Sequence, residues 1–182
     1  MDVFAALAVA FWSMLPAYVP NNVAVLAGGG PPIDGGRTLG DRRLLGDGKT
    51  WRGTIAGIVA GGVVALALDA LAPVARAATA IETLPPFPLA IAVALPLGAM
   101  LGDILASFVK RRLDRERGAS VPGLDQLDFV VGALGLAAVT DYRWFASTFT
   151  SSVLVVVLVI TPILHLGTNY VAYLLDLKRV PW

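Results

Sequence analysis

Apolar runs the length of a bilayer divide this chain, and they limit its possible folds more than any other feature of the sequence. A helix needs about 20 mainly apolar residues to cross a bilayer. Hydrophobic residues make up 57% of the 182 and charged residues 15%, whereas a soluble domain has about 45–50% and about 25%. We therefore predict an all-α integral membrane protein, a single domain over residues 1–182, with five transmembrane helices. These run from about Val3 to Leu26, Gly53 to Ala72, Pro86 to Val109, Asp125 to Thr140 and Ala146 to Leu175.

The first and last runs depart from a plain spanning helix. The segment PAYVPNN interrupts the first run, where Pro16 and Pro20 disrupt the backbone and Asn21 and Asn22 bring amides into the membrane. Such breaks are tolerated only inside the protein or beside a cavity. The last run is longer than a bilayer requires, so we expect it to tilt or to kink at Pro162. The second run has a small-residue face suited to close helix packing, made of Gly53, Gly57 and Gly61.

Positive charge predicts which side of the membrane each segment faces. Five spans place the two termini on opposite sides, and cytoplasmic loops carry an excess of Lys and Arg. Residues 27–52, residues 110–124 and the C-terminal tail hold all of the 14 Lys and Arg except Arg76 and Arg143. We therefore expect two long cytoplasmic loops that form a polar cavity, a cytoplasmic C-terminus and an N-terminus outside the cell membrane.

Two residue types useful in catalysis are scarce. The chain has no cysteine and one histidine, His165, which lies in an apolar segment. Disulfides, thiolate metal sites and cysteine nucleophiles are excluded, and both a histidine-based acid–base mechanism and a metal site of several histidines are disfavoured. We interpret His165, Asp69 and Asp176 as structural or interfacial. The net charge of +1 indicates no class of partner, and we expect no nucleic acid among the partners.

One helix face in the third run carries Asp103, Ser107, Lys110 and Arg111, at i, i+4, i+7 and i+8. Asp103 lies roughly 10 Å further into the membrane than Lys110 at 1.5 Å per residue. A carboxylate at that depth costs about 2.5–3.5 kcal/mol unless it is paired or hydrated. An Asp103–Lys110 pair that stabilises the helix end is one interpretation. A metal ligand in a water-filled cavity open to the cytoplasm is the sharper one.

A second acidic group opens the fourth run. Asp125 and Asp128 share a helix face at i, i+3. Helix capping is one interpretation, with Asp125 at the N-cap and Asp128 at the third helical position. If both point into one cavity with Asp103, the three carboxylates repel each other without a cation. Mg²⁺ suits such a site, because it binds few carboxylates together with waters and substrate phosphates.

The first long loop, residues 27–52, is rich in glycine and cationic side chains. Glycine lets backbone N–H groups approach phosphate closely, and Lys and Arg neutralise its charge. The segment GDGKT is similar to the end of a phosphate-binding P-loop, but the full spacing fails at Leu44. A cytoplasmic loop that is basic only because of its location is the alternative. Together with the three carboxylates, the loop predicts a metal–polyphosphate site at the membrane edge.

At these residues the sequence resembles a known family. The segment SFVKR from Ser107, followed by DQLD at Asp125, is similar to the signature of the CDP-diacylglycerol synthases, in which an Arg stands at the position of Gln126. The His-Gly-Gly segment of the bacterial and eukaryotic members is absent. The segments LPAYVPNN, GGGPPIDGG and LGDGKTWRG resemble the archaeal CDP-archaeol synthases instead. The resemblance runs from Leu15 to Asp128.

The resemblance implies five membrane helices, two cytoplasmic loops around a charged cavity, and Mg²⁺ as cofactor. It also implies transfer of CMP from CTP to an isoprenoid ether-lipid phosphate, 2,3-bis-O-geranylgeranylglycerol 1-phosphate, which gives CDP-archaeol and pyrophosphate. The nucleophile would be a phosphate monoester oxygen, already anionic at neutral pH, so little or no general base is needed.

Our hypothesis gives each polar residue a role. Asp103, Asp125 and Asp128 would bind the metal, and with Lys110 they make up the catalytic set. Lys49, Arg52 and Arg111 would contact phosphate. Asp47 and Gly48 would shape the loop that binds the nucleotide, and Asn21 and Asn22 would line the cavity. The proposed substrate-binding residues are Asn21, Asn22, Asp47, Gly48, Lys49, Thr50, Arg52, Ser107 and Arg111.

Other membrane proteins remain as alternatives. An ester lipid could replace the ether lipid as acceptor. Polyprenyl transferases also hold Mg²⁺–diphosphate with Asp pairs, but they need a second Asp-rich motif and more helices than we count. The motif of the CDP-alcohol phosphotransferases is not met by DGGR at Asp34. A small transporter would explain Asp103 and the broken first helix, although the charges gather on one face instead of crossing the bilayer.

Overall fold

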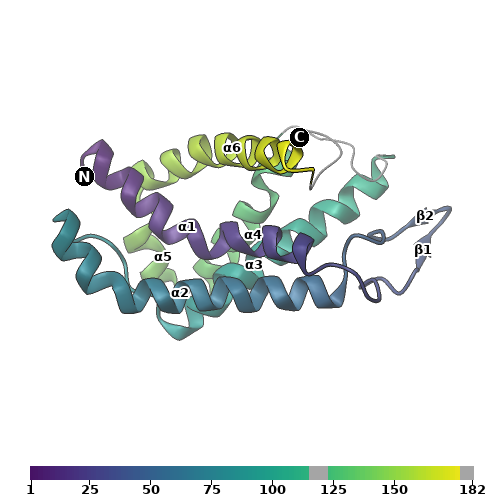
Figure 1. Ribbon diagram of the computed structural model, residues 1–182, viewed down its shortest axis with the longest axis horizontal. Coiled ribbons are helices and arrows are strands. Elements are labelled where there is room, and N and C mark those ends of the chain that lie inside the picture. The colour runs from purple at the N-terminus through teal and green to yellow at the C-terminus, as the bar shows by residue number, and fades with distance from the viewer. Residues whose placement is uncertain (115–122, 177–182) are drawn as a thin grey trace.

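The computed structural model describes residues 1–114 and 123–176, which are mostly helical (Figure 1). Six helices are joined by loops, one of which carries a hairpin of two-residue antiparallel strands. The helices are α1 (Val3–Leu26), α2 (Trp51–Thr79), α3 (Leu89–Arg112), α4 (Leu124–Thr140), α5 (Tyr142–Thr148) and α6 (Ser151–Leu174), and the strands are β1 (Thr38–Leu39) and β2 (Arg42–Arg43).

Four of these helices are long and apolar enough to cross a membrane. They are α1, α2, α3 and α6, with 24, 29, 24 and 24 residues. The fourth predicted span, Asp125–Thr140, corresponds to α4, whose 17 residues extend about 25 Å at 1.5 Å per residue, less than a hydrocarbon core of about 30 Å. The described residues therefore confirm a helical protein with several membrane spans, four of them by length and composition.

The expected break in the first span is wrong, because α1 is one continuous helix that contains both Pro16 and Pro20. A proline within a helix removes one N–H and frees the carbonyl four residues earlier. Here Pro20 cannot donate to the carbonyl of Pro16, and that carbonyl instead faces α2 at Gly61. The prolines alter the packing surface of the helix without ending it.

The last predicted span, Ala146–Leu175, is also wrong as a single helix. The chain turns at Phe149 and Thr150, which separate the short α5 from α6. The Asp141 carboxylate caps α5 by accepting a hydrogen bond from the Trp144 N–H at 2.9 Å. The turn accounts for the extra length of the predicted run, and Pro162 lies inside α6.

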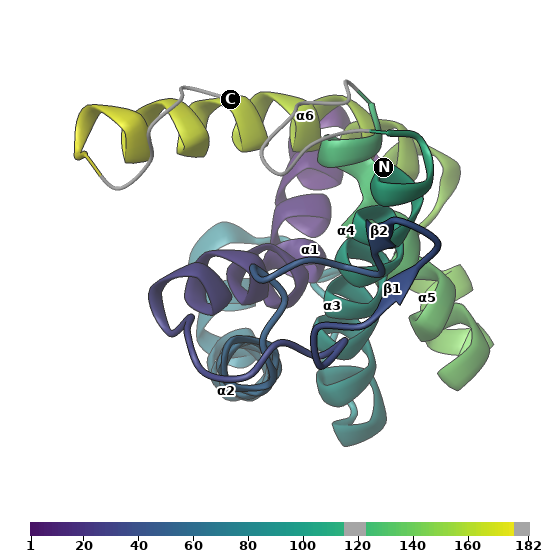
Figure 2. The same ribbon diagram turned by 90° about the vertical axis from the view of Figure 1, so that its right-hand side faces the viewer.

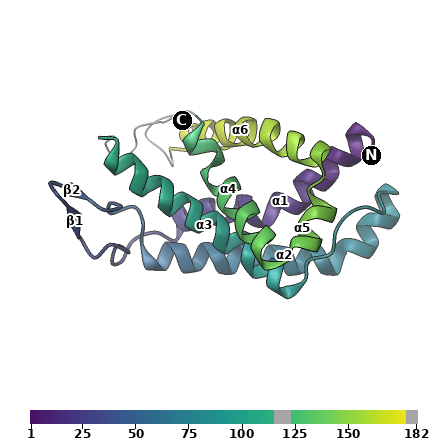
Figure 3. The same cartoon turned by 180° about the vertical axis from the view of Figure 1, so that it is seen from behind.

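The predicted glycine face of α2 packs against α1, as expected. A Cβ added at Gly53 would lie 2.8 Å from the carbonyl oxygen of Ala24, and one added at Gly57 would lie 2.7 Å from that of Pro20. The same close approach recurs between α3 and α4, where Gly98 and Gly102 meet the α4 backbone (Figure 3). Glycine is required at these crossings because any side chain would force the backbones apart.

The loop between α2 and α3 is fixed by side chains of the surrounding helices. Asp69 accepts a hydrogen bond from the Phe87 N–H at 2.8 Å, and Arg76 donates to the Leu84 carbonyl at 2.6 Å. The indole N–H groups of Trp12 and Trp144 donate to the carbonyls of Pro85 and Pro86. Asp69 therefore has a structural role, as expected from the sequence.

Helix α6 is packed much less closely than α3. In their most apolar stretches, 56% of α3 is buried inside the protein and only 17% of α6. Figure 2 shows α6 lying across one side of the other helices and extending beyond them. Its contact with α1 includes a hydrogen bond of 2.8 Å between the hydroxyls of Tyr18 and Thr161.

Candidate active site

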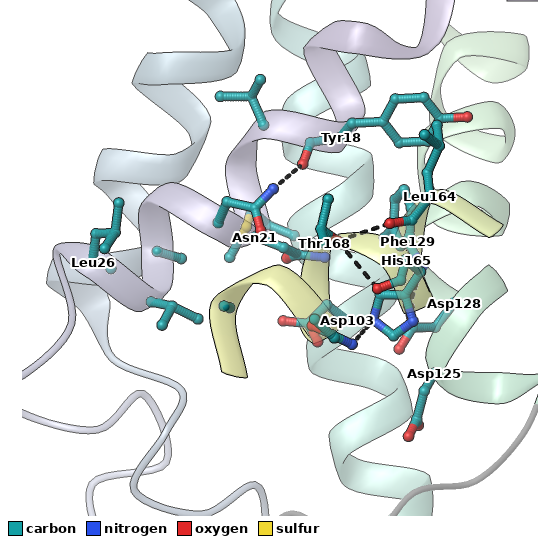
Figure 4. A pocket seen from close by; sticks show the side chains of 18 of the residues that line it. Tyr18, Asn21, Leu26, Asp103, Asp125, Asp128, Phe129, Leu164, His165 and Thr168 are labelled. Atoms are coloured by element: carbon teal, nitrogen blue, oxygen red, sulfur yellow. Dashed lines mark hydrogen bonds between the residues drawn. The ribbon is translucent and has the colours of Figure 1, made fainter. Parts of the chain in front are cut away.

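A cavity of about 670 Å³ lies between α1, α3, α4, α6 and the start of α2 (Figure 4). One part of its wall is charged, with Lys49, Asp103, Asp125 and Asp128. Another part is apolar and comes mainly from α1, with contributions from α3, α4 and α6. The apolar lining comprises Phe11, Leu15, Val19, Ala24, Val25, Leu26, Met100, Phe129, Leu164 and Ala172.

Two ion pairs cross between elements at the charged part. The Lys49 ammonium contacts the Asp103 carboxylate, and the Lys110 ammonium contacts the Asp125 carboxylate. The alternative pairing of Asp103 with Lys110 along α3 is therefore wrong. Each pair links α3 to another part of the chain, the loop before α2 in one case and α4 in the other, so helix packing brings the four charges together.

Asp128 also lines the charged part, at the second turn of α4. One of its carboxylate oxygens accepts a hydrogen bond from the Phe129 N–H at 2.6 Å, and its charge repels that of Asp103. Asp128 forms no salt bridge within the described residues. It is thus the carboxylate of the three that most needs a cation.

The start of α4 is capped by a residue other than the two aspartates. Gly123 occupies the N-cap with a φ of 85°, and its N–H donates to the side-chain oxygen of Gln126. The interpretation of Asp125 as the N-cap is therefore wrong: Asp125 follows the cap by two residues and pairs with Lys110. Gln126 frees both aspartates from capping, and this gives a physical reason for its position between them.

Asp34 organises the loop that carries Lys49, and the sequence analysis gave it no role. Its carboxylate accepts hydrogen bonds from the backbone of Gly36, Leu45 and Gly46 at 3.0–3.1 Å. The Arg43 guanidinium donates to it at 2.8 Å and, with the backbone N–H groups, holds the pKa of the Asp34 carboxyl well below its usual range. A hydrogen bond from the Ile33 N–H to the Lys49 carbonyl at 2.8 Å joins the two ends of this loop.

Arg112 attaches this loop to α3. Its guanidinium donates to the carbonyls of Leu39 and Arg43, both at 2.9 Å, and lies 5.4 Å from the centre of the Phe108 ring. The loop, the hairpin and the C-terminal end of α3 therefore form one unit, visible at the same end of the molecule in Figure 1. This unit fixes the approach of Lys49 to Asp103.

The predicted substrate-binding residues divide between the cavity wall and its supports. Asn21, Asn22, Gly48, Lys49 and Thr50 line the cavity. The others lie outside the lining. Arg52 donates to the Ala27 carbonyl at 2.7 Å, Ser107 to the Asp103 carbonyl at 2.9 Å, Asp47 pairs with Arg43 at 2.7 Å, and Arg111 is half-buried near the end of α3.

Thr50 supports the site as well as lining it. It is the N-cap of α2, where its hydroxyl accepts a hydrogen bond from the Gly53 N–H at 3.2 Å. This cap starts α2 immediately after Lys49, and Lys49 thereby lies at the junction of the loop and the helix. The side chain of Thr50 is buried, so its hydroxyl serves the helix terminus.

Helix α6 contributes a polar wall that the sequence analysis missed. Thr161, His165, Thr168 and Asn169 all line the cavity, and the Asn169 amide lies 3.2 Å from the His165 ring nitrogen. Their spacing of three and four residues places them on one helix face, a signal that the apolar composition of the segment obscured. The assignment of His165 as structural or interfacial thus overlooked its location in the cavity wall.

The donors present suit a hard divalent cation only in part. Among the described residues, no three His, Cys, Asp or Glu side chains are close enough to hold one ion together. Two of the three carboxylates are paired with lysine. Mg²⁺, however, commonly uses one or two carboxylates and completes its shell with waters and substrate phosphates. Asp128 with Asp103 fits that pattern, and the expected three-carboxylate cluster does not form.

Comparison with known proteins agrees with this site. A sequence model of the CarS-like CDP-archaeol synthases matches residues 3–182. A CDP-archaeol synthase of Halorubrum lacusprofundi is 64% identical over 96% of this chain and 97% of its own. One from Halobacterium salinarum is 59% identical over the full length of both. A solved structure described as an intramembrane enzyme for archaeal membrane lipid biosynthesis is 41% identical, covers 88% of this chain and 92% of its own, and superposes with a TM-score of 0.69.

Proposed function

The chain belongs to the CDP-archaeol synthase family. We propose that the cavity between α1, α3, α4 and α6 is where CMP is transferred from CTP to an ether-lipid phosphate. The acceptor is 2,3-bis-O-geranylgeranylglycerol 1-phosphate, and the products are CDP-archaeol and pyrophosphate. The proposal places this cytidylyltransferase reaction at a membrane–water boundary.

One observation carries the assignment of the site. The same cavity has a charged part, lined by Lys49, Asp103, Asp125 and Asp128, and an apolar part lined by Phe11, Leu15 and Val19. A phosphate group and its isoprenoid tails need these two environments side by side. A soluble nucleotide site would lack the apolar wall, and a simple lipid groove would lack the charges.

The reaction joins two anions. A non-bridging oxygen of the lipid phosphate attacks the α-phosphorus of CTP and forms a new P–O bond. The bond from that phosphorus to the bridging oxygen breaks, and pyrophosphate leaves with the electron pair. The nucleophile needs little or no proton removal, because the second pKa of a phosphate monoester is about 6. The protein must mainly position the reactants and offset their charge.

Lys49 and Lys110 are the cations available for that purpose. Each is paired with a carboxylate in the described structure, so an arriving phosphate competes with Asp103 or Asp125 for an ammonium group. Asp103, once released by Lys49, would be free to hold a cation together with Asp128. The paired state thus keeps buried charges compensated before the substrates bind.

Mg²⁺ is the cofactor that this donor set favours, and Asp128 and Asp103 are the residues we assign to it. When bound, the ion would neutralise phosphate oxygens and stabilise the leaving pyrophosphate. Ser107 donates a hydrogen bond to the backbone carbonyl of Asp103, and Gln126 caps the start of α4, the helix that carries Asp128.

We extend the proposal to membrane topology. With α4 as a short fifth span, the loop of residues 27–50, the C-terminal end of α3 and the end of α6 all face the cytoplasm. Their location toward one end of the molecule, away from the N-terminus, supports this orientation (Figure 1). The excess of Lys and Arg on those segments supports it independently.

The reaction is tested with purified protein in liposomes. Label from α-³²P-CTP should enter the lipid fraction, label from γ-³²P-CTP should appear as pyrophosphate, and EDTA should stop both. The acceptor should be supplied as matched ether- and ester-linked lipid phosphates. Transfer to the ester lipid alone would contradict the proposed acceptor, and flux of solute without labelled lipid would indicate a transporter.

A further inference from the structure

Asn21 and Asn22 both line the cavity but differ in how their amides are used. Asn22 is exposed, and its amide N–H donates to the Tyr18 carbonyl at 3.2 Å. The side-chain oxygen of Asn21 is buried and accepts no hydrogen bond from any residue of 1–114 or 123–176. Figure 4 shows Asn21 on α1, with Asp103 and Thr168 on the neighbouring walls. A buried amide oxygen without a donor is costly, so a ligand is its natural partner.

The chemistry of the two substrates limits which group can satisfy this oxygen. It requires a hydrogen-bond donor. The lipid phosphate offers phosphate and ether oxygens, which are acceptors, and hydrocarbon tails. The triphosphate of CTP also offers only acceptors near neutral pH. Donors occur only on the nucleoside, as the 4-amino group of cytosine and the hydroxyls of the ribose.

The amide of asparagine is a better match for the base than for the sugar. It presents an acceptor beside a donor, and the edge of cytosine presents the 4-amino donor beside the ring N3 acceptor. Paired contacts of this kind are how Asn reads a base edge elsewhere. A ribose hydroxyl would leave the amide N–H of Asn21 without such a counterpart.

We infer that Asn21 determines base specificity, its side-chain oxygen accepting a hydrogen bond from the 4-amino group of CTP. The inference rests on the proposed function and adds a selectivity element to it. Uracil carries a carbonyl at that position, so UTP would set two acceptors against each other as long as the Asn21 amide keeps its described orientation. A two-point amide contact gives about 5- to 150-fold discrimination between bases.

The wild-type protein provides the first test, through kcat/KM for four nucleotides with the same lipid phosphate. CTP and dCTP should be used at similar rates, and UTP and N4,N4-dimethyl-CTP should both fall by about 5- to 150-fold. Full use of the dimethyl analogue would overturn the inference. A loss confined to dCTP would assign the contact to the ribose and overturn it too. Absence of any product with CTP would instead refute the proposed function.

A variant pair provides the second test. Asn21→Leu keeps the size of the side chain and removes both hydrogen-bonding groups, so the ratio of kcat/KM for CTP over UTP should fall toward one. Asn22→Ala, whatever it does to turnover, should retain the wild-type ratio. An unchanged ratio in Asn21→Leu would contradict the inference, as would a ratio lost equally in both variants. If Asn21→Leu fails to fold, the wild-type analogue series still decides.

Discussion

Helices α1 to α4 and helix α6 enclose the same cavity in different ways. The first four meet through glycines, so that the backbones of α3 and α4 are nearly in contact at Gly98, Gly102 and Gly132. Helix α6 carries Gly167, where an added Cβ would have no neighbour within 4 Å. The closely packed helices and the loop before α2 carry all the charged groups of the lining, and α6 contributes uncharged polar groups and His165.

This difference indicates that the two parts of the cavity wall have different roles. Charged groups that handle phosphate must be held within a fraction of an ångström, and glycine contacts between backbones provide that rigidity. Helix α6 carries none of the charged groups of the lining, so its looser packing does not displace them. We therefore expect changes among the closely packed helices to affect both stability and catalysis, and comparable changes on α6 to affect them less.

The largest effect is expected from Asp128→Asn. Removing this carboxylate, which forms no salt bridge within residues 1–114 and 123–176, should lower transfer by about 10³-fold, as for loss of a key electrostatic group, with little change in the unfolding temperature. Asp69→Asn is the matched control, because its amide oxygen can still accept from the Phe87 N–H. Loss of activity in both variants, or in neither, would remove Asp128 from the site. The measurement is ³²P transfer in liposomes.

Glycine substitutions compare the two regions directly. A Cβ at Gly102 would overlap the backbone carbonyl of Asp128, so Gly102→Ala should reduce stability by about 3 kcal/mol and displace that aspartate. Gly167→Ala meets open space on α6 and should be neutral, or stabilising by about 0.5–1 kcal/mol. Unfolding of the two variants in the same detergent measures the contrast. Equal effects would mean that the two regions are packed alike.

Lys49→Met tests whether the ammonium acts on phosphate or only compensates Asp103. It should lower kcat/KM by about 10²-fold, or about 2.7 kcal/mol. Asp103→Asn supplies the other side of a double-mutant cycle. Because the two side chains are in contact, their effects should not add. Strict additivity would show that the pair is not maintained in the working enzyme.

The smallest effect is expected at the Asp34 cluster, and it is measured as stability. A carboxyl with a lowered folded-state pKa stabilises the fold fully above its unfolded pKa of about 3.9, and that contribution is lost as pH falls through the lower folded-state value. Asp34→Asn should therefore cost about 2 kcal/mol at neutral pH, and the difference from wild type should shrink only below about pH 4. Asp47→Asn, which removes an exposed partner of the same Arg43, should cost about 0.5 kcal/mol. A difference that declines between pH 8 and 5 would contradict the assignment.

Hydropathy and helical spacing predicted much of the fold and part of the site. Apolar runs located the long helices, and the spacing of Gly53, Gly57 and Gly61 predicted a face for close helix packing, which the structure places against α1. The turn at Phe149 and Thr150 was missed because the long apolar run after it dominates the hydropathy of the segment. Ser and Thr surround Phe149 from Ser147 to Ser152, and these residues favour turns and helix caps. Local composition also overestimated the disruption that Pro16 and Pro20 cause in α1. The Pro16 carbonyl, which Pro20 leaves without its helical hydrogen bond, packs against α2 at Gly61.

The site shows a similar division. The sequence identified Asp103, Asp125 and Asp128 from the cost of burying charge, and all three line the cavity. One of its two interpretations of Asp103 paired it with Lys110, the nearest cation along the same helix, whereas the partner is Lys49, 54 residues away. Long-range pairing depends on how helices cross, which spacing within one helix does not encode. The polar face of α6 was missed because four polar residues were spread through an apolar segment.

The central claim is that Lys49 from the loop and Asp103 from α3 meet at the place where the phosphates of CTP bind. A carbodiimide joins an ammonium and a carboxylate only when they are in contact, and mass spectrometry identifies the joined peptides. We predict a Lys49–Asp103 cross-link in the nucleotide-free protein in liposomes, strongly reduced by CTP with Mg²⁺. A cross-link between Asp103 and Lys110 in its place, or a Lys49–Asp103 cross-link that CTP leaves unchanged, would contradict the account.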